Sequence, residues 1–217
     1  KSSTMDTIID ANNRTAAAHI VIIASPVELI HQPQQSIIRH REVGRDVRSF
    51  KHGAIEALRQ DPDIIVLGEL RDPDTILTAL EVADSGHKTF STLHTASAIE
   101  SIDRIIGEMP PDTQERVRNR LADVLTVVIS QKLVRGASGQ YHLCKEVLLN
   151  TPPVKAAIRN NNTADIYQVL QEGGKWGMHT LEQDLKRTVD AGEISQQEAL
   201  NHANNKKRLR QLIHYVE

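Results

Sequence analysis

Short aliphatic runs and amphipathic segments alternate along the first part of the chain. Runs of mainly β-branched residues predict buried strands at 20–23 and 64–67, and residues 89–93 have the character of a third strand. Strands that alternate with helices indicate a parallel α/β sheet with helices on both faces. The hydrophobic spacing predicts helices at 3–12, 48–60, 73–83, 97–107 and 112–122.

The pattern changes in the last third of the chain. Segments 124–134 and 141–149 are strand-like and flank a turn that contains glycine, which suits a hairpin. After Thr151-Pro152-Pro153 the sequence has helical patterns and turns but no convincing strand. We therefore expect a sheet domain over 1–150 and a small all-helical subdomain over 151–217.

Composition and charge narrow the class of protein. The chain of 217 residues is 39% apolar and 25% charged, which is ordinary for a globular protein. Its net charge of −2 gives no whole-chain attraction to nucleic acid or to an anionic membrane. The single cysteine, Cys144, excludes a disulfide within the chain and a four-cysteine zinc site. No apolar run approaches the roughly 18–20 residues of a membrane span. The chain opens at Lys1 without an initiator methionine, so we expect a further N-terminal part.

An acidic residue follows the second predicted strand. Residues 63–69 form an apolar run that ends in Glu69. A carboxylate held rigidly at the end of a buried strand can orient a water molecule and a metal ion beside phosphate groups. The alternative is an ordinary buried strand followed by a capping glutamate, and this segment alone does not separate the two.

The first residues of the chain suit phosphate binding. A phosphate-binding loop ends in Gly-Lys-Ser/Thr and runs directly into a helix. This chain opens with Lys1-Ser2-Ser3-Thr4 and continues with a helical pattern. The glycines are absent and Lys-Ser also occurs by chance, so this segment gains weight only from the motifs that follow it.

Two further segments carry side chains of types that can bind phosphate. Residues 86–95 place His87 and His94 at the two ends of a Ser/Thr-rich strand. Each is either a structural histidine or a group that senses phosphate. A zinc site is disfavoured, because no nearby cysteine or third histidine has the spacing of a metal ligand. Residues 39–48 carry four arginines within a polar stretch, 30–47, that predicts a loop or an edge segment. They are either a solvated charged loop or arginine fingers, because the planar guanidinium can bind phosphate oxygens with two N–H groups.

Taken in order, these motifs resemble those of the type II/IV secretion and type IV pilus motor ATPases. Residues 61–72 resemble the Walker B stretch of that family, 86–95 its His box, 41–46 its arginine-bearing stretch and 1–4 the end of its Walker A motif. The resemblance covers nearly the whole chain, and the order and spacing of four motifs make it specific. It implies an α/β fold with a RecA-like P-loop NTPase sheet domain followed by the helical subdomain.

Within the family, two features make the chain most similar to PilT-type pilus retraction motors. Extension and type II secretion ATPases usually carry a four-cysteine zinc insertion, which a single cysteine excludes here. Segments 151–159, 178–182 and 191–195 resemble the C-terminal part of the retraction motors, although Pro153 and Lys155 depart from the usual opening of the first of these helices.

The resemblance implies how ATP and Mg²⁺ would be held. Lys1, Ser2, Ser3 and His87 would bind ATP, with Lys1 on the β- and γ-phosphates. Ser2 would ligate Mg²⁺, and Glu69 would order the metal-bound or attacking water.

The resemblance also implies further catalytic groups. His94 would lie near the γ-phosphate or link it to the subunit interface. Arg41 and Arg45 would act from across a subunit boundary or from the N-terminal domain, and Arg71 would act near Walker B. Arginines that stabilise the transition-state charge are worth about 10³–10⁵-fold in such enzymes.

One stretch departs from the family pattern. The Asp box of the family normally reads Glu-Asp-Pro-Ile-Glu, and the corresponding residues here are Ala24-Ser25-Pro26-Val27-Glu28. Ala24 replaces the glutamate that the family is thought to use to activate water or hold Mg²⁺, and loss of a general base commonly costs about 10²–10⁴-fold in rate. Either Glu69 or Glu28 takes over this role, or the chain binds ATP and hydrolyses it poorly.

The machine that the resemblance implies is a cytoplasmic homohexamer, peripherally associated with the inner membrane. Its partners would be an inner-membrane platform protein of a pilus or secretion machine and a paralogous ATPase, and ATP hydrolysis would power type IV pilus retraction and twitching motility. The N-terminal part would supply the other half of each nucleotide cleft. The alternatives are a degenerate nucleotide-binding subunit that assists an active paralogue and a related secretion or pilus-assembly ATPase. A nucleic-acid translocase on the same fold is disfavoured by the near-neutral charge and the lack of interleaved aromatic and basic residues, so no nucleic acid is expected.

Overall fold

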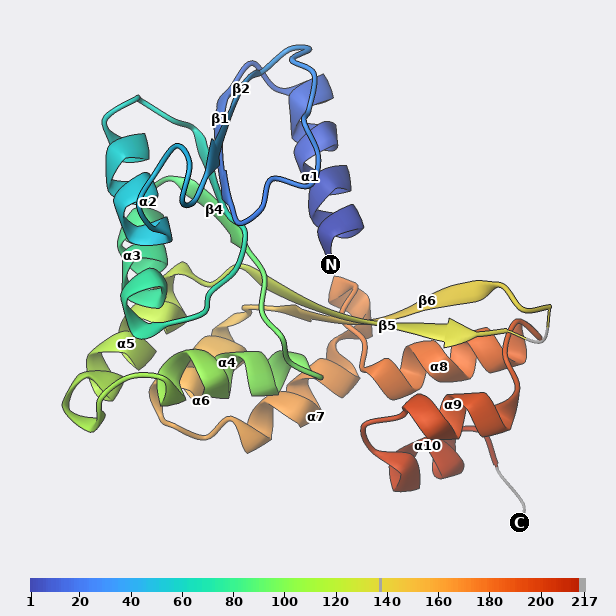
Figure 1. Cartoon of the computed structure of the whole chain (residues 1–217). Helices are drawn as coiled ribbons and strands as arrows, with labels where there is room; N and C mark the ends of the chain where they lie inside the picture. The colour runs from blue at the N-terminus through green and yellow to red at the C-terminus, as the bar shows by residue number, and fades with distance from the viewer. Residues whose placement is uncertain (137, 215–217) are drawn as a thin grey trace. The chain divides into compact units, whose positions relative to one another are not determined.

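Figure 1 shows the computed structural model of the chain, which describes residues 1–136 and 138–214. Contacts within the chain divide it into two compact units, Lys1–Leu93 and His94–Glu217. Each unit has its own sheet and its own helices, so the two are described separately.

The first unit is a parallel sheet with helices between its strands. Its strands lie in the order β2-β1-β3-β4, and every neighbouring pair is parallel. The carboxyl ends of all four strands therefore lie along one edge of the sheet, and the parallel α/β fold expected from the sequence is confirmed. The elements are α1 (Ser2–Thr15), β1 (His19–Ala24), β2 (Ile37–Glu42), α2 (Phe50–Leu58), β3 (Ile64–Leu67), α3 (Pro73–Asp84) and β4 (Lys88–Ser91).

Helices cover both faces of this sheet. Ile20 and Ile22 of β1 belong to a buried cluster with Ile9 of α1, whereas Val21 and Ile23 pack with residues of α2 and α3. Figure 1 shows α1 on one side of the sheet and α2 with α3 on the other. Burial on both faces explains why β1 and β3 are continuous aliphatic runs without alternating polar positions.

The polar stretch 30–47 contains β2, which is the edge strand of the sheet. Ile38 is buried in the α1 cluster, whereas Ile37 is 57% exposed. With one neighbour and one covered face, β2 needs few apolar residues, which accounts for its weak hydrophobic pattern. The edge-segment interpretation is therefore confirmed for 37–42.

Local signals set the ends of α3. Asp72 accepts a hydrogen bond from the Thr75 backbone N–H at 2.9 Å and caps the helix, which has Pro73 in its first turn. Beyond its last turn Gly86 adopts a φ of +95°, which glycine reaches without strain. The chain can therefore turn at once into β4, whose residues follow from Lys88.

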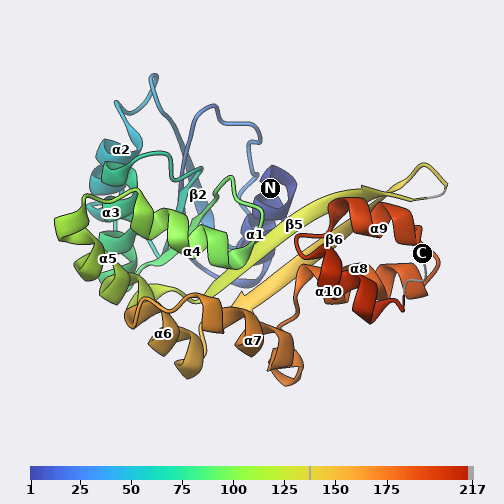
Figure 2. The same cartoon turned by 90° about the horizontal axis from the view of Figure 1, so that it is seen from below.

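The second unit is an antiparallel hairpin packed with helices. Figure 2 shows β5 and β6 side by side as a long ribbon, with α8 and α9 beside it. The hairpin is confirmed, and residue 137 of the expected turn lies outside the described part of the chain. The elements are α4 (Ala98–Gly107), α5 (Pro111–Val124), β5 (Val127–Arg135), β6 (Tyr141–Leu149), α6 (Pro152–Arg159), α7 (Ala164–Glu172), the 3₁₀ helix η1 (Gly173–Trp176), α8 (Leu181–Asp190), α9 (Gln196–His202) and α10 (Lys206–Leu212).

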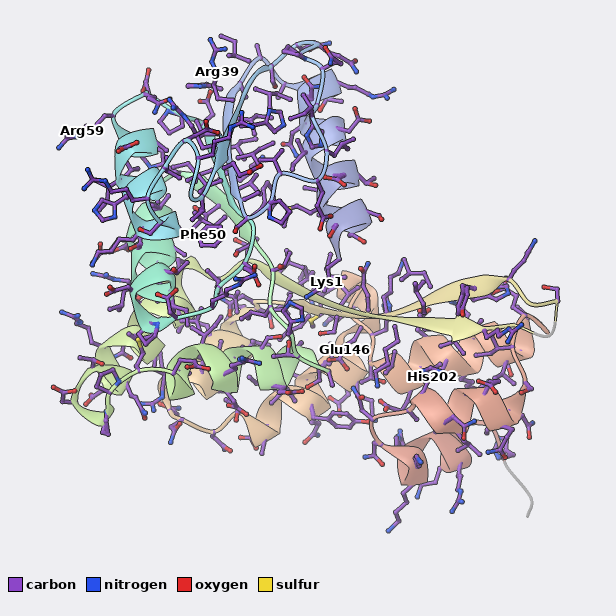
Figure 3. All side chains as sticks on the ribbon, in the orientation of Figure 1. Lys1, Arg39, Phe50, Arg59, Glu146 and His202 are labelled. Carbon is purple, nitrogen blue, oxygen red and sulfur yellow. The ribbon has the colours of Figure 1, made fainter. Side chains whose placement is uncertain are left out.

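A buried carboxylate joins the hairpin to two helices of this unit. Glu146 of β6 is 3% exposed, and Figure 3 labels it. Its Oε1 accepts a hydrogen bond from the Ala98 backbone N–H at 2.8 Å, and its Oε2 accepts one from the Leu181 backbone N–H at 3.3 Å. These donors are the first residues of α4 and α8, whose N–H groups have no partner within their own helix.

The division between the units does not coincide with the boundary expected at residue 150. Val134 and Cys144 of the hairpin are buried with Leu181 and Leu185 of α8, so the hairpin packs into the same unit as the C-terminal helices. A separate subdomain over 151–217 stays a prediction. Within the described residues, no helix combines the length and the apolar character needed to cross a bilayer.

Candidate functional site

The candidate site lies at the carboxyl edge of the parallel sheet in the first unit. In open α/β sheets, ligands bind outside the carboxyl ends of the strands. Glu69 follows β3 directly after Gly68, and Ala24 ends β1, the strand beside it. The amino end of α1 lies at the same edge, where Lys1 is close enough to Glu69 to feel its negative charge. Figure 3 shows Lys1 at that end of α1.

The backbone around Glu69 is fixed on both sides. The Gly68 N–H donates to the Ile23 carbonyl at 2.8 Å, and the Gly68 carbonyl accepts from the Thr92 hydroxyl at 2.7 Å. On the other side of Glu69, the Leu70 N–H donates to the Thr92 carbonyl at 3.0 Å. The carboxylate is therefore carried by a chain segment tied to β1 and to the residue that follows β4, which holds its position relative to both.

Glycine at position 68 allows the close approach of β1 and the Glu69 segment. A Cβ atom on Gly68 would lie 3.3 Å from the Cα of Ala24 and 3.3 Å from the Ile23 carbonyl oxygen. Contacts of that length to backbone atoms force the backbone to shift. A larger residue would therefore separate the two strand ends at the point where Glu69 emerges.

Glu69 has two basic neighbours at this edge. Its side chain is 18% exposed and forms an ion pair with Arg71, which is 60% exposed. Partial burial lowers the pKa of Lys1 from the ordinary lysine value, and the negative charge of Glu69 opposes that shift. Lys1, Glu69 and Arg71 are thus brought together, and Ser2 and Ser3 are exposed on the first turn of α1.

The stretch that departs from the family pattern also lies at this edge. Ala24 is the last residue of β1 and pairs with Glu42 of β2 in the parallel register. Glu42 is partly buried, and its Oε2 accepts a hydrogen bond from the Val27 backbone N–H at 3.2 Å. Glu28, which the sequence analysis considered as a substitute carboxylate, is exposed in the loop after β1.

Glu42 is a site residue that the sequence analysis missed. The sequence analysis singled out the arginines on either side of Glu42. Only the strand register places the Glu42 carboxylate opposite Ala24. The one signal in the sequence is the alternation of Ile38, His40 and Glu42 along an edge strand, which places the three on one face. That signal does not reveal which strand lies next to it.

Arg41 and Arg45 lie near the carboxyl end of β2, at the same edge of the sheet. Arg41 lies in β2 opposite Ile23 and is partly buried, while the Arg45 side chain is 75% exposed beside Asp46 at 3.4 Å. The pKa of Asp46 is lowered, first by the hydrogen bond from the Glu42 backbone N–H and then by Arg45 and Arg41. The turn after β2 is thus fixed, and the Arg45 guanidinium extends outward from it.

The two histidines of the 86–95 segment lie at opposite ends of β4. His87 precedes the strand at its amino end, where the Lys88 N–H donates to the Asp63 carbonyl at 3.2 Å. Four residues of strand span about 13 Å, so His87 lies at the opposite edge of the sheet from Glu69. We therefore exclude it from the candidate site. Its Nδ1 contacts the Ser85 hydroxyl at 2.9 Å, which suits a structural role.

His94 follows the carboxyl end of β4 by three residues and opens the second unit. Its backbone carbonyl accepts a hydrogen bond from Arg104 Nη1 at 3.0 Å. Its predicted role beside phosphate stays a prediction.

The donors at this edge fit a nucleotide that brings its own metal ion. Across residues 1–136 and 138–214, no group of three His, Cys, Asp or Glu side chains could hold a metal ion alone. Mg²⁺ usually takes one or two protein oxygens together with phosphate oxygens and water. The Ser2 hydroxyl and the Glu69 carboxylate supply oxygens of that kind, and Lys1 supplies a cation for phosphate.

Comparison with known proteins agrees with this arrangement. A family model described as "Type II/IV secretion system protein" matches residues 1–214. A "Twitching motility protein" of Neisseria gonorrhoeae is 40% identical over 210 residues, covering 96% of this chain and 56% of that protein. The "Type IV pilus retractation ATPase PilT" of Pseudomonas aeruginosa is 39% identical over 203 residues, covering 94% of this chain and 59% of that protein.

A solved structure has the same fold. The crystal structure of the pilus retraction motor PilT with bound ADP superposes with a TM-score of 0.91 at 36% identity, covering 97% of this chain and 60% of that one. The RecA-like ATPase fold expected from the motifs is thereby confirmed. The chain spans a little more than half the length of these relatives.

Proposed function

Because the chain belongs to the family of type II/IV secretion system proteins, we propose that it is the ATP-binding and hydrolysing part of a motor that powers type IV pilus retraction. The observation that carries this proposal is the placement of Glu69. Its carboxylate is fixed after a buried strand and lies near Lys1 at the amino end of a helix. The same fold occurs in a pilus retraction motor whose structure contains bound ADP. Two relatives support the proposal, since one is named a type IV pilus retraction ATPase and the other is a pilus retraction motor with bound ADP.

Each residue at the edge has a chemical task in this proposal. The amino end of α1, with the backbone N–H groups of its first turn and Lys1, would attract the phosphates. Ser2 and Glu69 would supply protein oxygens for Mg²⁺, which would bring positive charge to the phosphates. Glu69 holds the attacking water by hydrogen bonding and accepts its proton, since its carboxylate has acceptor oxygens only.

The arginines and His94 complete the proposal. Arg71 orients the Glu69 carboxylate through their ion pair. Arg41 lies in β2 and Arg45 in the turn after it, and the Arg45 side chain is 75% exposed. In this proposal the two arginines would act on the nucleotide of a neighbouring subunit. His94 would act near the γ-phosphate, as the resemblance to the family implies. An arginine that acts in trans makes fast turnover depend on ring assembly, which is why we propose a homohexamer.

The assembly and its surroundings are part of the same proposal. The homohexamer would work in the cytoplasm on an inner-membrane platform protein of a pilus machine, with a paralogous ATPase as a further partner and without nucleic acid. A segment outside this chain would complete each nucleotide cleft. Support comes from the relatives' pilus and twitching names and from the near-neutral charge of the chain.

Steady-state ATP hydrolysis by the whole protein tests the proposal. Glu69→Gln keeps the size of the side chain and removes the proton acceptor, so kcat should fall by about 10²–10⁴-fold. The matched control is Glu56→Gln, an exposed glutamate of α2 in the same unit, which should leave kcat unchanged. A Glu69→Gln enzyme that keeps most of its activity would show that Glu69 does not act on water.

Ala24 supports a second candidate function, a nucleotide-binding subunit that hydrolyses ATP poorly and assists an active paralogue. The side chain at the end of β1 is a methyl group, and the nearest carboxylate across the register is that of Glu42. If the unmodified protein is inert and Ala24→Glu produces hydrolysis, this second function holds. If the unmodified protein hydrolyses ATP and Glu69→Gln abolishes the activity, the motor function holds.

A further inference from the structure

Two hydroxyl side chains lie at the carboxyl end of β4, next to the strand end that carries Glu69. Strands β3 and β4 pair in parallel as far as Leu67 and Ser91, where the regular pairing stops. Glu69 lies two residues beyond that point. The contacts made past the strand ends therefore decide how firmly the Glu69 carboxylate is placed.

Ser91 and Thr92 continue the contact between the two segments through their side chains. Ser91 Oγ donates to the Leu67 carbonyl at 2.7 Å, and Thr92 Oγ1 donates to the Gly68 carbonyl at 2.7 Å. Both distances are those of well-formed O–H···O hydrogen bonds. A hydroxyl has a single O–H to donate, so each side chain is committed to one carbonyl. The two acceptors follow one another along the chain, and only the second belongs to the peptide group that leads into Glu69.

Thr92 also bonds to the peptide group on the other side of Glu69. The Leu70 N–H donates to the Thr92 carbonyl at 3.0 Å. The Gly68 carbonyl belongs to the peptide group before the Glu69 Cα, and the Leu70 N–H belongs to the peptide group after it. Thr92 thus holds both peptide groups that flank Glu69, one through its side chain and one through its backbone.

Holding both peptide groups restrains the direction of the Glu69 side chain. Peptide groups are planar, so the soft backbone torsions between these two groups are φ and ψ of Glu69. Because both groups are bonded to one residue, the two torsions are restrained and the Cα–Cβ bond leaves the chain in one direction. The far end of the side chain is held by the ion pair with Arg71. The tie of Gly68 to the Ile23 carbonyl places the segment beside β1, and Thr92 orients it.

A purely structural role for the Thr92 hydroxyl makes a different prediction. Hydroxyls that satisfy carbonyls at a strand end stabilise a fold wherever they occur. On that view Ser91 and Thr92 are equivalent, since their hydrogen bonds have the same length. On the positioning view they differ, because Leu67 is a fully buried strand residue whereas the acceptor of Thr92 adjoins Glu69.

We propose that Thr92 is a positioning residue for Glu69, whose hydroxyl and carbonyl together set the direction in which the Glu69 carboxylate meets the attacking water. The inference rests on the proposed ATPase function, in which Glu69 acts on that water. Misplacement of a catalytic group by about 1 Å can cost about 10²-fold in rate. Since Thr92 acts through Glu69, its loss should slow the chemical step and leave the binding of ATP unchanged.

Steady-state ATP hydrolysis by the whole protein compares the two hydroxyls. Thr92→Val keeps the shape of the side chain and removes the O–H, so kcat should fall by about 10–10²-fold with little change in the KM for ATP. Thr92→Ser keeps the hydroxyl and should retain most of kcat. Ser91→Ala is the matched control, because it removes a hydrogen bond of the same length one residue away and should leave kcat near the wild-type value.

A double-mutant cycle tests whether Thr92 acts through Glu69. We would measure kcat for Thr92→Val, Glu69→Gln and the double variant. Thr92→Val should lower kcat in the wild-type background and have no further effect once Glu69 is replaced. An equal fold-loss in both backgrounds would overturn the inference, as would an equal loss in Thr92→Val and Ser91→Ala.

Amide hydrogen exchange provides a readout that needs no activity. The Leu70 amide is bonded to the Thr92 carbonyl, so a loosened segment should exchange it about fivefold faster in Thr92→Val and at the wild-type rate in Ser91→Ala. If Thr92→Val does not fold, Thr92→Ala, which also lacks the hydroxyl, takes its place. Unchanged protection of Leu70 would show that the hydroxyl does not hold the segment and would refute the inference.

The two assays separate this inference from the proposed function. If the wild type hydrolyses no ATP, or Glu69→Gln keeps its activity, the proposed role of Glu69 fails, while hydrogen exchange still decides whether Thr92 holds the chain at Glu69. If Glu69→Gln abolishes hydrolysis and Thr92→Val leaves kcat unchanged, the proposed function stands and the positioning role of Thr92 is wrong.

Discussion

Replacing Glu146 by alanine should destabilise the second unit strongly. The carboxylate is 3% exposed and accepts hydrogen bonds from the first backbone N–H groups of α4 and α8. Alanine would leave both donors buried without an acceptor, and each such loss costs about 1–3 kcal/mol. Removal of the buried charge offsets part of this, because burial of the carboxylate is itself unfavourable and is the main reason that the pKa of Glu146 is raised. We expect a net loss of about 3 kcal/mol, against a total of about 5–15 kcal/mol for a folded domain.

Urea unfolding followed by far-UV circular dichroism and by the fluorescence of Trp176 measures this effect. Trp176 is the single tryptophan of the chain and lies in the same unit. Glu146→Gln keeps one acceptor oxygen and should lose roughly half as much stability as Glu146→Ala. Glu115→Ala, an exposed glutamate of α5, is the control and should stay within about 0.5 kcal/mol of the wild type. A Glu146→Ala protein as stable as this control would refute the view that the carboxylate links the two helix ends.

Three further outcomes are expected. Because burial raises the pKa of Glu146 above the ordinary glutamate value, the folded state binds more protons than the unfolded state just above that ordinary pKa, so stability should fall as the pH rises through this window. The decline should be weaker in Glu146→Gln, and identical urea-midpoint profiles would contradict this. Gly68→Ala should lower the free energy of unfolding by about 1–3 kcal/mol and reduce ATP hydrolysis, because the added Cβ would press on the Ala24 backbone. Gly107→Ala, whose Cβ would meet no atom within 4 Å, should be neutral or stabilising in the same unfolding assay. Cys144 is fully buried and burial raises its pKa, so a thiol reagent should label it only at the rate of unfolding. Labelling of the native protein at the rate of a free thiol would show that α8 and α9 do not cover it.

The local sequence determined the elements that carry the site. Buried strands at β1 and β3 could be predicted because a strand covered on both faces must be aliphatic throughout. The start and end of α3 follow from Asp72, Pro73 and Gly86, whose effects act within a few residues. Glu69 was recognisable for the same reason, since it is the first acidic residue after a continuous aliphatic run.

The partners of these elements were decided only by tertiary packing. No local pattern states that β2 lies beside β1, and so Glu42 could not be placed next to Ala24 from the sequence. The sequence analysis placed His87 in the ATP site with Glu69. The two lie at opposite ends of neighbouring strands, because His87 precedes β4 and Glu69 follows β3. The rings of His31 and His40 are stacked, a contact that depends on how the loop after β1 folds back beside β2.

The physical reason for this difference is range. Hydrophobic period, caps and glycine turns act over one or two turns of chain, so the sequence shows them directly. Strand order, register and the neighbours of a buried charge depend on how residues tens of positions apart fill a common core. Glu146 shows this well: from the sequence it is one polar residue in a strand, and only the fold brings Ala98 and Leu181 to its two oxygens.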